Sequence, residues 1–220
     1  MPKRFFYLFL LLLILFLPLL SSIFYKNFVF PEFLKLVFSI LLPSFIFILW
    51  DLRVVGKWWS FNNDYILGYR FKGLPLEEIM FFPVVSFSTL IIWVNLENLF
   101  ADSYYFVFLP AFIFLISFLI SIFSYFKGKI YSFFVFVLLC LLFIMDFLIG
   151  TKILFLKRNY IFILIVIFLT LIFNYPLTKL PVVSYNKKFF WGKRILTIPF
   201  EDFVYGIDFL ILVVMIYQFL

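Results

Sequence analysis

Two pairs of adjacent acids mark the sequence, and each pair follows a proline at the start of an apolar run. The first pair is Glu77 and Glu78, and the second is Glu201 and Asp202. Carboxyls that are partly removed from water favour the protonated form. A protonated carboxylic acid can donate a proton while an ionised neighbour assists it. The two pairs therefore indicate acid–base chemistry on an apolar substrate.

The same residues allow a purely structural interpretation. Proline favours the first turn of a helix, and acids there complement the helix dipole and the free N–H groups. A helix cap needs only one acid, however, and adjacent helical positions lie about 100° apart. Because the two acids of one pair cannot share a face, we expect at least one acid of each pair to point inward.

The acid pairs belong to a longer internal repeat. Matched positions are offset by 124 residues without a gap, and such self-similarity indicates a duplication. Phe81 maps onto Tyr205 in the same register. The other matched positions are Ser60-Phe61-Asn62, Gly68, Arg70, Pro75 and Glu77-Glu78 in the first copy, and Ser184-Tyr185-Asn186, Gly192, Arg194, Pro199 and Glu201-Asp202 in the second.

Composition places these motifs in a membrane protein. The chain has 220 residues, 67% of them hydrophobic, and its mean hydropathy is +1.21. A soluble domain is usually about 45–50% apolar, so lipid must solvate most of this chain. The sequence contains no histidine, which excludes His-ligated metals, haem and His-based triads. It also lacks the glycine fingerprints of dinucleotide and P-loop sites, and its single cysteine, Cys140, cannot form an internal disulfide.

Seven apolar segments approach the roughly 20 residues that a bilayer-spanning helix needs. We therefore expect an all-α fold, a polytopic membrane helix bundle. The first segment also resembles a signal peptide, but its length and the poor cleavage site at Leu20-Ser21-Ser22 favour a retained helix. The expected helices are Phe5–Phe24, Phe33–Trp50, Glu77–Leu96, Tyr104–Phe126, Ile130–Ile149, Tyr160–Asn174 and Phe200–Leu220.

The repeat divides this bundle into two units of three helices each. We expect the units at residues 1–103 and 130–220, with a linking helix in residues 104–129. The shift between the units is four helices, an even number, so both units should point the same way. Such parallel repeats are related by a pseudo-two-fold axis along the membrane normal. The two acidic motifs are therefore expected at one depth, facing each other.

The distribution of basic residues predicts the orientation in the membrane. One side holds 13 of the 18 Lys and Arg residues, and the other side holds 5. The positive-inside rule then places the N-terminus in the cytoplasm and the C-terminus outside. For this integral membrane protein we expect the plasma membrane as the location.

Two further acids lie inside apolar segments. Asp146 is in the fifth segment, and Asp208 is in the seventh, on nearly the same face as Glu201. Ionisable groups within a membrane are functional candidates by default, although a hydrogen bond between helices would explain them equally well. Asp51, at the end of the second segment, is expected at the membrane interface.

The motifs resemble a known family. Trp-Trp-Ser-Phe-Asn-x-x-Tyr-x-x-Gly from Trp58, followed by Leu-Pro-Leu-Glu-Glu-x-x-Phe-Phe from Leu74, resembles the first half of the heterodimeric-type, non-flavin lycopene cyclases. Leu-Pro-Val-Val-Ser-Tyr-Asn from Leu180, followed by Gly-x-Arg-x-x-x-Ile-Pro-Phe-Glu-Asp-Phe-x-Tyr-Gly from Gly192, resembles the second half. The halves are separate subunits in some bacteria and are fused in archaea and in a fungal bifunctional enzyme. The chain is similar to the fused form over nearly its whole length.

The resemblance implies a non-redox isomerisation of the linear ψ end groups of lycopene. A carboxylic acid protonates C2 of the terminal double bond, the C5=C6 bond attacks the cation at C1, and loss of a proton from C6 gives a β ring. Loss from C4 or from the C5 methyl group gives ε or γ rings. This chemistry uses no cofactor and no metal. The implied partners are a linear carotenoid, membrane lipid and other enzymes of the carotenoid pathway, and no nucleic acid.

The resemblance also implies roles for matched residues. The catalytic motifs of the family map onto Glu77, Glu78, Glu201 and Asp202. The other matched motif positions, to which we assign support or orientation of the acids, are Asn62, Arg70, Asn186 and Arg194.

Several alternatives remain open. The substrate could be a C50 carotenoid, and capture of the same cation by water would make the chain a hydratase. Seven helices with parallel repeats also fit a small-solute transporter, although the acids stand at helix starts and not at mid-membrane. An inactive structural partner in a carotenoid-synthesis complex is a further alternative, against which the two intact acidic motifs speak.

Overall fold

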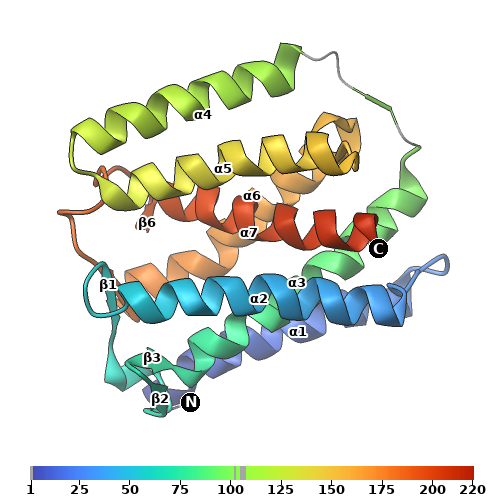
Figure 1. The fold of residues 1–220 in the computed structure, drawn as a ribbon. Coiled ribbons are helices and arrows are strands. Elements are labelled where there is room, and N and C mark those ends of the chain that lie inside the picture. Colours follow the sequence, from blue (N-terminus) through green and yellow to red (C-terminus); the bar gives the residue numbers. More distant parts are fainter. Residues whose placement is uncertain (1, 102, 105–107) are drawn as a thin grey trace.

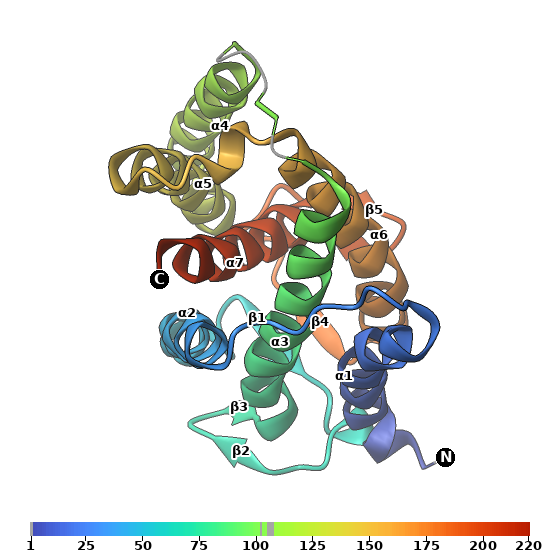
Figure 2. The same cartoon turned by 90° about the vertical axis from the view of Figure 1, so that its right-hand side faces the viewer.

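The computed structural model describes residues 2–101, 103–104 and 108–220, and seven long helices occupy most of them (Figures 1 and 2). This confirms the all-α fold class. The helices are α1 Phe6–Phe24, α2 Phe33–Val54, α3 Leu76–Leu99, α4 Phe108–Phe126, α5 Ile130–Ile149, α6 Lys157–Lys179 and α7 Phe200–Phe219. Short 3₁₀ turns lie at Lys3–Phe5, Asn63–Tyr65 and Ile153–Phe155.

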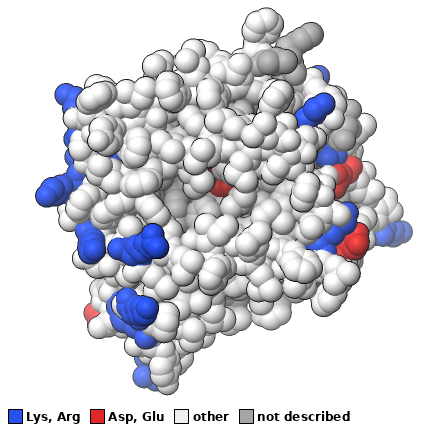
Figure 3. All heavy atoms as spheres, viewed as in Figure 1, with Lys and Arg blue, Asp and Glu red and all other residues white. Residues whose placement is uncertain are grey.

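Six of these helices, α1 to α6, are long and apolar enough to cross a membrane. Most of the face seen in Figure 3 is uncharged, with mostly Lys and Arg side chains along one edge and charges of both signs along the opposite edge. The seventh helix, α7, lies inside the bundle, where every side chain from Asp208 to Met215 is buried. The chain is therefore an integral membrane protein with a protein-enclosed central helix.

Short strands, which the sequence analysis did not predict, order the loops on the side of the bundle where β1, β2 and β3 lie in Figure 1. Strand β1 (Trp59–Phe61) pairs with β4 (Val183–Tyr185). Two hairpins precede α3 and α7 and are formed by β2 (Arg70–Phe71) with β3 (Leu74–Pro75), and by β5 (Arg194–Ile195) with β6 (Ile198–Pro199).

The pairing of β1 with β4 reveals the pseudo-two-fold axis of the repeat. The two strands are antiparallel, and Ser60 stands opposite Ser184, the residue 124 positions later. Around this point α1 packs on α3 as α5 packs on α7, and the second helix of each unit packs on the third helix of the other, α2 on α7 and α6 on α3. The two units are therefore interlocked, while α4 packs mainly on α5 (Figure 1).

The helix boundaries differ from expectation mainly in the sixth helix. We expected Tyr160–Asn174, whereas α6 runs from Lys157 to Lys179. Pro176 lies beyond the expected end, and proline disfavours helix in the residue before it. The proline lies in the last turn, however, and the added residue Leu177 is buried in the core beside the loops. The start of α4, expected at Tyr104, involves residues 105–107, which lie outside the described residues.

Candidate active site

One acid of each pair lines a small cavity between the two units. Glu78, from the first turn of α3, and Asp202, from the first turn of α7, both face this cavity of about 80 Å³. Asp51 near the end of α2 lines it as well. No Lys or Arg is among its lining residues, and burying several unpaired negative charges is costly. The cavity therefore disfavours negative charge on all three carboxyls at once.

Tyrosines from both units hold these carboxyls in place. The Tyr7 hydroxyl donates to Glu78 Oε2 at 2.5 Å, and the Tyr131 hydroxyl donates to Asp202 Oδ1 at 2.9 Å. Tyr7 and Tyr131 are themselves 124 positions apart, so each unit contributes the same tyrosine–acid pair. Asp202 accepts a second hydrogen bond, from the Tyr185 hydroxyl. Two phenol donors stabilise negative charge on Asp202 better than one stabilises it on Glu78.

Tyr185 lies in β4, outside the spanning helices, and remains a phenol. Burial of its side chain, and next the negative charge of Asp202, raise the pKa of the Tyr185 hydroxyl well above its ordinary value. Arg194, whose guanidinium carbon lies 5.7 Å from the Tyr185 ring centroid, opposes this effect. Tyr185 is therefore a permanent hydrogen-bond donor to Asp202.

The first acid of each pair, Glu77 or Glu201, has a different role. Glu77 Oε1 accepts the backbone N–H of Leu67 at 2.5 Å, and Glu201 Oε1 accepts that of Trp191 at 2.8 Å. Leu67 and Trp191 are again matched positions of the repeat. Glu201 Oε1 also accepts the Ser132 hydroxyl at 2.5 Å. Both first acids are buried and hold the loop that precedes their own helix.

The matched asparagines and arginines stabilise the same loops and do not bond to the acids. Asn62 accepts the N–H of Asp64 at 3.0 Å, and Asn186 accepts that of Lys188 at 3.1 Å. Each arginine closes its hairpin by donating to a backbone carbonyl: Arg70 donates to Gly73 at 2.7 Å, and Arg194 donates to Thr197. The four residues thus lie around the site and shape the loops that Glu77 and Glu201 hold.

The matched pair Phe81 and Tyr205 lies in the cavity wall. Tyr205 donates to Asp51 Oδ1 at 3.0 Å, so this tyrosine reaches from α7 to α2. Asp51, expected at the interface, is in fact buried, because α2 continues to Val54 and brings Asp51 within the bundle.

Asp146 and Asp208, the two acids that lie inside apolar segments, do not line this cavity. Asp208 is buried in α7, and neither of its oxygens has a hydrogen-bond partner among the described residues. Asp146 accepts the Thr151 hydroxyl at 2.5 Å, the Ile153 N–H at 2.9 Å and the Leu154 N–H at 3.0 Å. Asp146 thus holds the turn between α5 and α6, a local structural contact.

Asp146→Asn should lower stability and leave the site intact. The amide nitrogen that replaces one oxygen cannot accept a hydrogen bond, so a buried N–H of the turn loses its partner at a cost of about 1 kcal/mol. The midpoint of thermal unfolding in detergent should fall, whereas Asp64→Asn, at an exposed position, should leave it unchanged. Equal midpoints for the two variants would contradict this role.

Sequence reasoning missed four of the ionisable residues that line the cavity, and a signal existed for three of them. Tyr7 and Tyr131 obey the 124-residue offset but stand alone near the start of apolar runs, where the motif comparison did not extend. Tyr185 was in the repeat but was not singled out as a site residue. Asp51 has no acidic counterpart, because the matched position is Tyr175. Among the described residues no cluster of His, Cys, Asp or Glu side chains could hold a metal ion.

Comparison with known proteins agrees with the motifs. The family model described as lycopene cyclase matches residues 4–94 and 128–220, which together make up most of the chain and correspond to the two units. No curated protein and no solved structure matches the chain. The two matched segments carry both tyrosine–acid pairs of the cavity, and the chain therefore belongs to the lycopene cyclase family.

Proposed function

We propose that the chain closes the linear ψ end groups of lycopene into β rings by acid catalysis, giving γ-carotene and then β-carotene. Membership in the lycopene cyclase family supports a linear carotenoid as substrate and a place in carotenoid biosynthesis. The observation that carries the proposal is a cavity lined by one carboxyl from each unit. These are Glu78 from α3 and Asp202 from α7.

The proposed reaction moves one proton in and one proton out. Glu78, with one phenol donor, gives its proton to C2 of the terminal double bond, which leaves a cation at C1. The π electrons of C5=C6 then form the C1–C6 bond and move the positive charge to C5. Asp202, whose negative charge is stabilised by hydrogen bonds from two phenols, accepts the proton from C6. The product is an isomer of the substrate, so the enzyme would be an intramolecular lyase.

Aromatic side chains of the cavity suit a cationic intermediate. Trp59, Phe61 and Phe81 line the cavity beside the acids. Aromatic faces attract a cation by about 0.5–2 kcal/mol each, and most strongly where water is excluded. In this proposal they stabilise the positive charge at C1 and then at C5, while the carboxyls handle the protons. Glu77 and Glu201 act as positioning residues through the loops that they hold.

The location and the domain limits are part of the same proposal. The greater number of Lys and Arg residues on the side of β1 to β3 supports a cytoplasmic N-terminus in the plasma membrane. The matched segments 4–94 and 128–220 support units at 1–103 and 130–220 with a linking helix between them. Other enzymes of the carotenoid pathway are the proposed partners, because the substrate that they would share is dissolved in lipid.

Expression in a lycopene-accumulating bacterium tests the proposal. Chromatography of the pigments should show lycopene replaced by products of unchanged mass with the retention times of γ-carotene and β-carotene. A product heavier by one water would indicate a hydratase that uses the same cation. Unchanged lycopene, with the protein present in the membrane, would contradict the proposal and turn attention to C50 carotenoids or to solute transport.

A further inference from the structure

We infer that the polyene chain of the substrate binds in one apolar groove between α1, α3 and α6, and that each binding event therefore exposes only one end group to the acids. This inference rests on the proposed function and specifies how its substrate is held. It also predicts an asymmetry that the repeated sequence does not suggest.

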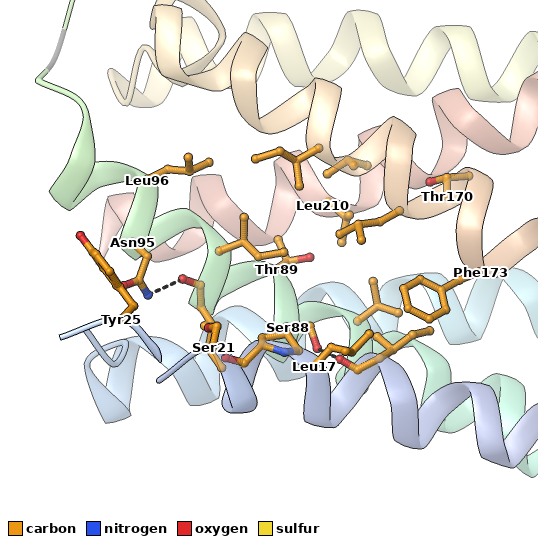
Figure 4. Close-up of a pocket in the computed structure, with 18 of the residues that line it drawn as sticks. Leu17, Ser21, Tyr25, Ser88, Thr89, Asn95, Leu96, Thr170, Phe173 and Leu210 are labelled. Atoms are coloured by element: carbon orange, nitrogen blue, oxygen red, sulfur yellow. Dashed lines mark hydrogen bonds between the residues drawn. The ribbon is translucent and has the colours of Figure 1, made fainter. Parts of the chain in front are cut away.

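The groove is a large cavity with a volume of about 460 Å³. Small-molecule sites typically measure about 300–1,000 Å³. Figure 4 shows side chains from three helices converging on it, among them Leu17 of α1, Thr89 of α3 and Phe173 of α6. Its walls are almost entirely apolar, as a hydrocarbon chain requires.

The groove begins where the acid cavity ends. Phe81 and Asn174 line both spaces, so the two adjoin. From Phe81 the groove follows α3 as far as Leu99, which is about 27 Å at 1.5 Å per residue. That length is close to the roughly 30 Å thickness of the hydrocarbon core of a bilayer. The shape suits a long linear polyene that lies across the membrane with one end at the acids.

The connection between α1 and α2 lies at the far end of the groove, where it contributes Tyr25 and Phe28 to the lining. Asn95 of α3 accepts the backbone N–H of Val29 at 3.0 Å and donates to its carbonyl at 2.9 Å. Asn95 and Tyr25 line the groove at this end (Figure 4). The second end group of the polyene would therefore lie far from Glu78 and Asp202.

The pseudo-symmetric position in the other unit is filled. Val85 of the groove corresponds to Phe209, whose ring lies 4.8 Å from that of Phe47 and 5.2 Å from that of Phe82 between centroids. Ser88 corresponds to Leu212, which is buried. In the other unit, larger side chains thus occupy the space that corresponds to the groove.

Two residues of α6 that line the groove are also smaller than the residues at the matched positions of α2. Asn174 corresponds to Trp50 of α2, whose ring lies 4.9 Å from Phe134 and 5.3 Å from Trp58 between centroids. Thr170 corresponds to Ile46. The duplication therefore supplies two acids to a single substrate site, and a substrate with two reactive ends must leave, turn and bind again.

Val85→Phe tests the groove by introducing the side chain that the other unit carries. Purified from lycopene-accumulating cells, this variant should carry at least tenfold less polyene per protein, measured by visible absorbance, than the wild-type protein. Thr170→Ile fills the opposite wall and should lower polyene binding too. Leu164→Phe adds an aromatic ring on α6 at a side chain that is 67% exposed, and it should bind polyene normally.

The readout separates this inference from the proposed function, because bound polyene is measured whether or not rings close. Polyene binding equal to that of Leu164→Phe in both groove variants, at matched protein amounts, would overturn the groove. Failure of the wild-type protein to cyclise lycopene, with binding lost in Val85→Phe, would overturn the proposed reaction and leave the groove supported.

The order of products tests the single site independently. With lycopene in large excess over purified wild-type enzyme in liposomes, the first product should be the monocyclic carotenoid alone, followed later by the bicyclic one. Bicyclic product from the first turnovers, without free monocyclic carotenoid, would contradict binding in one groove and one direction.

Discussion

Glu78→Gln and Asp202→Asn are each expected to slow ring closure by about 10²-fold or more, the usual contribution of general acid–base catalysis. Both variants keep the shape of the side chain, and the Gln oxygen can still accept the hydrogen bond of Tyr7. The Asn oxygen can accept from only one of the two phenols, Tyr131 or Tyr185, that bond to Asp202. Neither amide can exchange a proton with the substrate. The measurement is the initial rate of product formation in liposomes that contain lycopene, normalised to the amount of enzyme.

The neighbouring acids provide matched controls. Glu77→Gln and Glu201→Gln retain a carbonyl oxygen for the N–H groups of Leu67 and Trp191, so the loops should stay in place. These variants should lose far less rate than Glu78→Gln and Asp202→Asn. The opposite ranking, with Glu77→Gln or Glu201→Gln inactive at normal protein levels, would show that the wrong acid of the pair has been assigned as the proton carrier.

Glu201→Leu is expected to destabilise the protein strongly. This change removes the acceptor of two donors, the Trp191 N–H and the Ser132 hydroxyl, and leaving a buried donor unsatisfied costs about 1–3 kcal/mol. The midpoint of thermal unfolding in detergent should fall well below that of Glu201→Gln, and less protein should accumulate in the membrane.

Activity measurements on the same variant distinguish stability from chemistry. Any Glu201→Leu protein that remains folded should still bind polyene, because Glu201 does not line the groove or the acid cavity. An unfolding midpoint equal to that of the wild-type protein would rule out the loop-holding role of Glu201 and reopen a direct catalytic one.

The repeat allowed much of the fold to be predicted from sequence. An offset of 124 residues with an even number of helices required parallel units, and the structure places Ser60 opposite Ser184 at the axis between them. The fifth helix was predicted at Ile130–Ile149, its observed bounds, because Lys129 and Gly150 frame a continuous apolar run. The length of the apolar run was sufficient where a charged residue or a glycine marked each end of a segment.

The division of labour within each acid pair could not be predicted from sequence. Adjacent helical residues point about 100° apart, which shows that one acid must turn away but not which one. That choice depends on the loop that leads into the hairpin before each helix, because this loop brings the N–H of Leu67 or Trp191 to the first acid. Hairpins with two-residue strands leave no periodic signal, so neither they nor their effect was foreseen.

The hydrogen-bond partners of the acids were hidden for a related reason. Tyr7 and Tyr131 lie in apolar runs, where an aromatic residue does not indicate a site. Their role is evident only from the tertiary structure, in which each bonds to an acid 71 residues away. Asp51 looked interfacial because the apolar run weakens after Trp50. The helix continues one turn further, and that turn places the carboxyl beside Tyr205.

The strand pair on the pseudo-two-fold axis has a consequence for the ancestry of the chain. Antiparallel pairing of β1 with β4 about Ser60 and Ser184 is an isologous contact, in which the same segment meets its own copy. Identical chains of three helices could form that contact as a homodimer before any fusion, because closed two-fold association requires a self-complementary surface. An even helix count through α4 then joins the copies without inverting either one. Only after duplication, when the two copies could differ in sequence, could one copy of the polyene groove be filled by Phe209 and Trp50 while the other stayed open.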